Sequence, residues 1–153
     1  MQTYNMRVGA NAVIINDGSI LLIAFEDEDA GFHYNLPGGG VEVNETIPEA
    51  LTREVREETC AEIEVGRLVL VTEYEPTRNT ERYGTLHKLV LFFDCRLKEN
   101  PIARLPDNPD PHQIGVYWIP LKDLPNVPLL PEVASQLLTS YRQNCDSETY
   151  LSL

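Results

Sequence analysis

The chain has 153 residues, a length that suits one compact domain, so we predict a single domain over residues 1–153. Hydrophobic residues make up 42% and charged residues 24%, which is ordinary for a globular protein and unlike a disordered or membrane-embedded chain. The formal net charge of -12 would repel nucleic acid phosphates, which argues against general DNA or RNA binding.

The first third of the chain predicts a β-hairpin followed by a short strand. Val8 to Ile15 is rich in small and β-branched residues, Asn16-Asp17-Gly18 has turn chemistry, and Ser19 to Phe25 is apolar again. After an acidic loop, Phe32 to Leu36 predicts another strand. The three consecutive glycines Gly38 to Gly40 then predict a turn or a close approach of the backbone to another group.

A helix is predicted from Thr46 to Thr59. Thr46 and Glu49 have the spacing of a capping box, in which each residue satisfies a backbone N–H of the other. The apolar positions recur every four residues and define one face that can pack on a sheet. These positions are Ile47, Leu51 and Val55.

The remaining sequence predicts more strands and a second helix. The predicted elements are strands at Ile63 to Tyr74, Leu86 to Leu97 and Val116 to Ile119, polar or irregular segments at Glu75 to Gly84 and Asn100 to Gln113, and a helix from Pro131 to about Asn144. Strands before, between and after two helices indicate an α/β sandwich with a mixed sheet.

The first helix carries a cluster of glutamates. At 3.6 residues per turn, Glu54, Glu57 and Glu58 fall within an arc of roughly 100°. Each like-charge pair disfavours an isolated helix by roughly 0.2–0.5 kcal/mol, and a hard divalent cation would convert that repulsion into attraction. Oxygen ligands of this kind predict Mg²⁺ or Mn²⁺ as the cofactor.

The segment from Gly39 to Ala61 resembles the Nudix box. It reads Gly39-x5-Glu45-x7-Arg53-Glu54-Val55-x-Glu57-Glu58-x-Cys60-Ala61 and covers 23 residues, with Cys60 where the family pattern has glycine. The resemblance implies a Nudix-type α/β/α sandwich with a mixed β-sheet. It also implies a pyrophosphohydrolase that cleaves, with a divalent metal, the diphosphate linkage of a nucleoside diphosphate derivative or a nucleoside triphosphate.

The same resemblance assigns roles to individual residues. Glu54, Glu57 and Glu58 would be the side-chain metal ligands and the carbonyl of Gly38 a backbone ligand, with Glu57, Glu54 and Arg53 as the catalytic group. Arg53 and Glu57 have the i,i+4 spacing of an ion pair, and Glu45 would brace Arg53 or the glycine loop. The general base stays open between a helix glutamate and a late loop containing Asp107, Asp110, His112 and Gln113.

Substrate contacts are expected at the glycines and in the polar segment after the third long strand. Gly39 and Gly40 leave room for phosphates, while Arg78, Arg82 and Tyr83, with Tyr74, offer charge and stacking surface. An ordinary loop or a dimer contact is an equally good interpretation of that segment. A Nudix-fold module that binds nucleotides without turnover is the alternative function, and no pairing of Cys and Glu clearly supports allylic diphosphate isomerisation.

The three cysteines bear on compartment and on local geometry. Their odd number and wide spacing favour a reduced, cytoplasmic protein, and neither a signal peptide nor a membrane span is predicted. The expected partner is a small nucleotide-like diphosphate, with monomer and homodimer both open. Because Cys60 lacks the freedom of glycine, we expect the end of the first helix to differ in geometry.

Overall fold

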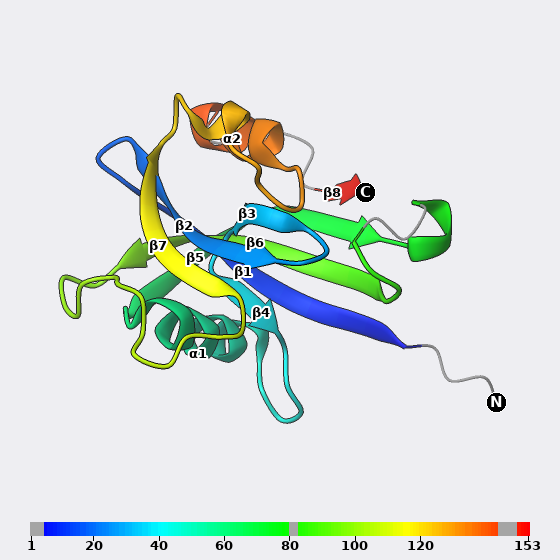
Figure 1. The fold of residues 1–153 in the computed structure, drawn as a ribbon, viewed down its shortest axis with the longest axis horizontal. Coiled ribbons are helices and arrows are strands. Elements are labelled where there is room, and N and C mark those ends of the chain that lie inside the picture. Colours follow the sequence, from blue (N-terminus) through cyan, green and yellow to red (C-terminus); the bar gives the residue numbers. More distant parts are fainter. Residues whose placement is uncertain (1–4, 80–82, 144–149) are drawn as a thin grey trace.

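The computed structural model describes residues 5–79, 83–143 and 150–153. Figure 1 shows the course of the chain from the long strand β1 to the short strand β8. The elements, in chain order, are β1 (Met6–Asn16), β2 (Ser19–Asp27), β3 (Gly31–Asn35), β4 (Gly38–Gly40), α1 (Ile47–Thr59), β5 (Ile63–Tyr74), the 3₁₀ turn η1 (Pro76–Arg78), β6 (His87–Leu97), β7 (Gln113–Pro120), the 3₁₀ turn η2 (Leu124–Asn126), α2 (Ala134–Gln143) and β8 (Tyr150–Ser152).

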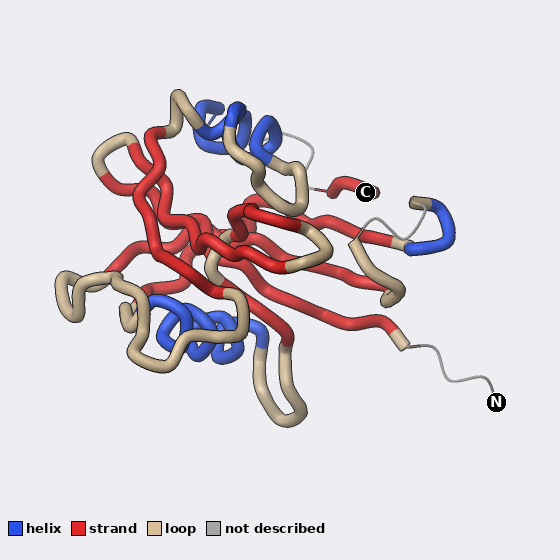
Figure 2. Tube along the Cα trace, viewed as in Figure 1, coloured by secondary structure: helices blue, strands red, loops and turns tan. Residues whose placement is uncertain are grey.

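The strands of the described residues form a mixed sheet. Its main path runs β3-β2-β1-β6-β5-β8, with β4 paired to β1 and β7 paired to β2. The pairs β1 with β6 and β5 with β8 are parallel, whereas the other pairs are antiparallel. Figure 2 shows the two helices on opposite sides of the strands, which confirms the predicted α/β/α sandwich.

Strand β1 supplies core residues to both faces of the sheet. Successive side chains of a strand point to opposite faces, so Ala12 and Ile14 pack with Leu51 and Val55 of α1 in one cluster. Val13 packs in the other cluster, which includes residues of α2. The apolar face predicted for the first helix is therefore buried on the sheet. Within the described residues, neither helix has the length and apolar character that crossing a bilayer would require.

Local patterns located most elements but not all of their limits. The glycine triplet is strand β4 rather than a turn, because it pairs with β1. Helix α2 begins at Ala134, not at Pro131, because the preceding segment is held in extended form against β3: Tyr34 N–H donates to Pro128 O, and Leu130 N–H donates to Tyr34 O. Strand β8 was not predicted, since three residues carry too little pattern to stand out.

Candidate active site

The N-terminus of α1 is fixed by the predicted capping box. The Thr46 hydroxyl accepts a hydrogen bond from the Glu49 N–H at 3.4 Å, and the Glu49 carboxylate accepts one from the Thr46 N–H at 2.8 Å. Leu51 and Val55 are fully buried against the sheet. This anchoring sets the rotation of the helix and turns Glu54 and Glu58 toward β4.

Strand β4 consists of glycines because side chains from two sides occupy the space beside it. A Cβ at Gly39 would lie within 2.7 Å of both carboxylate oxygens of Glu54. A Cβ at Gly40 would lie 2.9 Å from the guanidinium carbon of Arg7. The carboxylate of α1 therefore lies on one face of this strand, and the guanidinium of a β1 residue lies on the other.

Arg53 connects the glutamates to the glycine strand. Its guanidinium donates two hydrogen bonds to Glu45, at 2.8 and 3.0 Å, and one to Gly40 O at 3.1 Å. It also donates to Glu54 at 2.8 Å and to Glu57 at 3.3 Å. The hydrogen bonds to Glu45 and then Glu54 raise the pKa of Arg53, so it remains a fixed cation. The expected brace from Glu45 is present, and the contact with Glu54 is an addition to it.

The three glutamates differ strongly in environment. Glu58 is only 6% exposed, and its Oε2 accepts the Gly38 N–H at 2.9 Å. Burial raises the pKa of Glu58 to about 8, helped by the nearby charges of Glu54, Asp110 and Glu57. Burial likewise raises the pKa of Glu54, against the lowering effect of Arg53. The side chain of Glu57 is 57% exposed, so it lies on the solvent side of this glutamate cluster.

Of the four loop residues considered as bases, Asp110 lies close enough for its negative charge to raise the pKa values of Glu54 and Glu58. Gln113 holds this loop to the helix, since its Nε2 donates to Glu58 O at 2.8 Å and its N–H donates to Asp110 O at 3.0 Å. Asp107 instead forms an exposed pair with Arg104. A long-range hydrogen bond, and not a local pattern, therefore distinguishes Asp110 from its neighbours.

The donor set suits a hard divalent cation. Carboxylate oxygens are the ligands preferred by Mg²⁺, Mn²⁺ and Ca²⁺. Burial raises the pKa of both Glu54 and Glu58, and the negative charges of neighbouring carboxylates raise it further, a repulsion that a cation would relieve. In the described part of the chain, no three acidic, histidine or cysteine side chains already converge as a complete ligand set. Two oxygens are instead engaged by protein donors, Arg53 for Glu54 and the Gly38 N–H for Glu58.

A cavity of about 780 Å³ lies on the α2 side of the sheet. Tyr83, a predicted substrate contact, lines it together with Tyr74, and the two rings meet edge to face with centroids 5.4 Å apart. Arg78 is on the exposed turn η1 and is not a lining residue, while Arg82 lies outside the described residues. The lining also includes Asp27, Glu28, Asp29, Ala30, His33, Asn35, Thr72, Gly84, Lys88, Val90, His112, Leu130, Pro131 and Leu153.

Sequence reasoning missed the cations beside this cavity. Lys88 lines the cavity, and Arg7 is its neighbour across the β1–β6 pair. Lys88 lies in a predicted strand and Arg7 directly precedes the predicted strand Val8 to Ile15, so both basic residues were visible in the sequence. Their proximity follows from a parallel register between segments about 80 residues apart, which no local pattern specifies.

Cys60 adopts the left-handed conformation that glycine usually takes at a helix end. Its φ is 59° and its ψ is 3°, and its N–H donates to Arg56 O at 2.9 Å. The expectation of a different helix end is therefore wrong, because the packing of α1 and the loop over its C-terminus keep the usual geometry in spite of the side chain. Because Cys60 has a side chain, this left-handed conformation costs about 1–2 kcal/mol of backbone strain that glycine would not have.

We predict that Cys60→Gly raises the free energy of unfolding by about 0.5–1 kcal/mol. The relief of left-handed strain is partly offset by the greater freedom of glycine in the unfolded chain, about 0.4–1 kcal/mol. Urea denaturation of the reduced protein measures this difference. Cys60→Ala is the matched control, because alanine removes the thiol but keeps the strain. A glycine variant no more stable than the alanine variant would contradict the prediction.

The buried carboxyl of Glu58 predicts an unusual dependence of stability on pH. Because its pKa rises from 4.5 to about 8 on folding, the metal-free folded protein holds a proton that the unfolded chain has lost. Stability contributed by this group is therefore present at low pH and falls as pH rises through that window. Between pH 7 and 8, above the usual range of histidine, EDTA-treated protein should lose stability by up to about 1.4 kcal/mol per pH unit.

Urea denaturation at pH 7 and 8 tests this slope. Glu58→Gln should flatten it, since glutamine does not titrate, whereas Glu62→Gln should keep it. Glu62 is a suitable control because it pairs with Arg56 of the same helix but is not among the charges that act on Glu58. An unchanged slope in Glu58→Gln would show that another group titrates.

Comparison with known proteins places this geometry in a family. The sequence matches the family described as NUDIX domain over residues 5–141. It is 37% identical, over a 95-residue alignment, to a protein named nucleoside triphosphatase NudI from Escherichia coli O1:K1 / APEC. That alignment covers 54% of this chain and 63% of the relative, so the chain spans less than two thirds of the relative's length.

Solved structures show the same fold. The MutT NUDIX hydrolase from Burkholderia pseudomallei is 28% identical, with a TM-score of 0.71 and coverage of 88% of this chain and 97% of that one. A NUDIX hydrolase from Nitrosomonas europaea is 22% identical, with a TM-score of 0.75 and coverage of 92% and 90%. Because the family match covers nearly the whole chain and includes the glutamate helix and the glycine strand, this protein belongs to the Nudix hydrolase family.

Proposed function

We propose that this protein hydrolyses a phosphoanhydride bond in a nucleoside triphosphate or a nucleoside diphosphate derivative, with Mg²⁺ or Mn²⁺ as cofactor. The observation that carries the proposal is the position of Glu54 and Glu58 against β4. The carboxylate of Glu54 lies beside Gly39, and that of Glu58 accepts the Gly38 N–H. The negative charge of Asp110 also acts on this site. Crowded acidic oxygens beside side-chain-free backbone suit both a divalent cation and phosphate oxygens.

The proposed metal ligands are Glu54, Glu57, Glu58 and the carbonyl of Gly38. In an antiparallel pair, alternate residues turn both their N–H and their C=O away from the partner strand. The Gly38 N–H points away from β1 and donates to Glu58. Because the N–H and C=O of one residue share a side in this pattern, the Gly38 carbonyl is expected on the edge of β4 that faces away from β1. Once bound, a divalent cation would draw charge from the phosphate oxygens and lower the pKa of the attacking water.

The protein's own groups orient the reaction. Arg53 holds Glu54 and Glu57 through hydrogen bonds and is itself fixed by Glu45, which keeps both carboxylates in one arrangement. Gly39 and Gly40 leave the backbone open to phosphates. Glu57 and Asp110 are the proposed candidates for the general base, since, among the residues that the structure describes, no backbone N–H holds either carboxylate as the Gly38 N–H holds Glu58.

The proposed substrate places its nucleoside in the 780 Å³ cavity, where Tyr74 and Tyr83 offer aromatic surface. The name of the Escherichia coli relative, nucleoside triphosphatase NudI, makes nucleoside triphosphates the first class to test. We propose that one domain, residues 1–153, carries out this reaction. The described cysteines Cys60 and Cys95 are both free, which supports a reducing, cytoplasmic location.

A substrate panel tests the proposal. Nucleoside triphosphates, their oxidised forms, nucleoside diphosphate sugars and dinucleoside polyphosphates are incubated with Mg²⁺, with Mn²⁺ and with EDTA, and products are separated by ion-exchange chromatography. We expect cleavage that yields a nucleoside monophosphate and that stops in EDTA. Binding of a nucleotide without cleavage of any compound would favour the non-catalytic module instead.

A further inference from the structure

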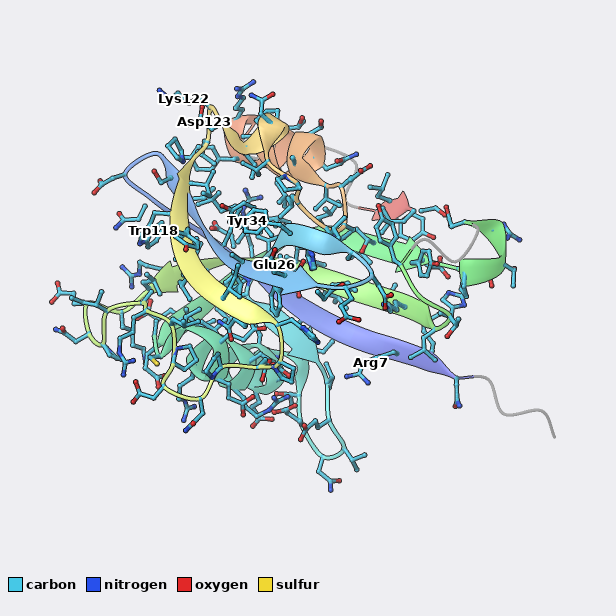
Figure 3. All side chains as sticks on the ribbon, in the orientation of Figure 1. Arg7, Glu26, Tyr34, Trp118, Lys122 and Asp123 are labelled. Atoms are coloured by element: carbon cyan, nitrogen blue, oxygen red, sulfur yellow. The ribbon has the colours of Figure 1, made fainter. Side chains whose placement is uncertain are left out.

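A second group of charges lies beside the carboxylate cluster and is of opposite sign. Arg7 of β1 is the register partner of Lys88 of β6 in the parallel pair, so their side chains leave the same face of the sheet. The Arg7 guanidinium lies over Gly40, and Lys88 lines the cavity. Figure 3 shows Arg7 beside β1, on the side where β4 runs.

These two cations are close together, and no carboxylate of residues 5–79, 83–143 or 150–153 pairs with either of them. The pKa of Lys88 is lowered by burial and by the charge of Arg7, which shows that the two groups repel each other. Among the described residues, neither forms an ion pair. The Lys88 ammonium donates to Tyr83 O at 2.7 Å, which leaves two of its three donors for another group. In a chain of formal charge -12, an unneutralised pair of cations requires an explanation.

The contacts form a continuous path from the cavity to the carboxylates. Lys88 lines the cavity and neighbours Arg7, whose guanidinium lies over Gly40. The neighbouring residue, Gly39, has the carboxylate of Glu54 against the opposite face of the strand. Strand β4 therefore has a cation against the face of Gly40 and a carboxylate against the face of Gly39, so a ligand bound across the edge of this strand can contact both charges.

We propose that Arg7 and Lys88 form an anion subsite that binds the phosphate attached directly to the nucleoside of the substrate. This inference rests on the proposed function for the identity of the ligand. The carboxylate site would hold the outer two phosphates through divalent cations, and the cation pair would hold the inner one directly. The subsite favours nucleoside triphosphates, which have a phosphate for each position, over nucleoside diphosphate sugars, which have one phosphate fewer.

A nucleoside monophosphate isolates this subsite from the metal site. It carries a nucleoside and one phosphate, so it can occupy the cavity and the cation pair when EDTA removes divalent cations. Calorimetry would compare the four common ribonucleoside 5′-monophosphates with their nucleosides. We expect the wild-type protein to bind at least one monophosphate about ten-fold or more tightly than its nucleoside, a difference that shrinks in 0.5 M salt.

Two variants and a control assign that difference to the cation pair. Arg7→Ala and Lys88→Met should each remove most of the preference for the monophosphate while nucleoside affinity stays within about two-fold, whereas Arg7→Lys should keep part of it. Arg67→Ala is the control, because Arg67 is exposed on β5 and does not line the cavity. Equal binding of nucleoside and monophosphate by the wild type, or binding of neither, would overturn the proposal.

Turnover separates this inference from the proposed function. With a nucleoside triphosphate that the protein cleaves, Arg7→Ala should raise KM about ten-fold, because the variant loses a contact that holds the inner phosphate of the substrate. Unchanged KM with normal cleavage would refute the subsite while the proposed function stands. Binding of monophosphate through Arg7 without any cleavage would refute the proposed function while the subsite stands.

Discussion

Replacing Glu57 with glutamine should lower kcat/KM at least about 100-fold while leaving the fold intact. Removing a group that only supports a metal ligand typically costs 10–100-fold, so loss of a proposed ligand should cost more. Glu57 is 57% exposed and has one ion pair, at 3.3 Å, with Arg53. A pair of this kind contributes about 0.3–0.5 kcal/mol, so the melting temperature should change by no more than about 2 °C.

Steady-state kinetics across a series of Mg²⁺ concentrations measures this effect and reports the change in apparent metal affinity. Glu62→Gln is the matched control, since it also removes a carboxylate paired with an arginine of α1, yet its partner is Arg56. The control should keep wild-type rates. If Glu57→Gln also kept them, the assignment of this glutamate to the metal site would be wrong.

Arg53→Lys should lower kcat about 10–100-fold and destabilise the fold by about 1–3 kcal/mol. The guanidinium holds Glu45 with two hydrogen bonds and also holds Glu54, Glu57 and Gly40 O, a set that the single ammonium of lysine cannot reproduce. The carboxylates would remain but lose their common orientation. Glu54 would remain shielded from water, but its carboxylate would lose part of the hydrogen bonding and positive charge of Arg53 that offset this burial.

Arg56→Lys provides the comparison for this substitution. Arg56 is on the same helix, but its side chain is 59% exposed and its ion pair is with Glu62. It should change stability by no more than about 0.5 kcal/mol and leave kcat unchanged. Kinetics at saturating Mg²⁺ and urea denaturation together distinguish the two arginines. Equal effects at both positions would show that the network around Arg53 has no special role.

The glutamate helix could be predicted from the sequence because its determinants are local. The capping box at Thr46 and the four-residue spacing of Leu51 and Val55 both act within one or two turns, so they fix where the helix begins and which side is buried. The rotation of the helix then determines where Glu54 and Glu58 point. The unequal burial of the glutamates was not predictable, since it depends on how closely β4 approaches the helix.

The features that sequence reasoning missed depend on contacts between distant segments. Lys88 reaches the neighbourhood of Arg7 only through the parallel register of β1 and β6. Asp110 was one of several polar loop residues until the hydrogen bond from Gln113 to Glu58 O tied its loop to α1. Arg78 carried suitable chemistry, but the turn η1 places it in an exposed position outside the cavity lining.

The carboxylates and the cavity lie on different faces of the sheet. Glu54 and Glu58 belong to the α1 layer, whereas Val90 and Leu153 of the cavity wall pack with the cluster on the α2 side. Mutations that reshape the wall need not disturb the helix, because the strands between them keep the two layers apart. With the nucleoside of the substrate in this cavity, as proposed, exchange of Tyr74, Val90 or Tyr83 should change the preferred nucleobase and leave the carboxylates of α1 in place.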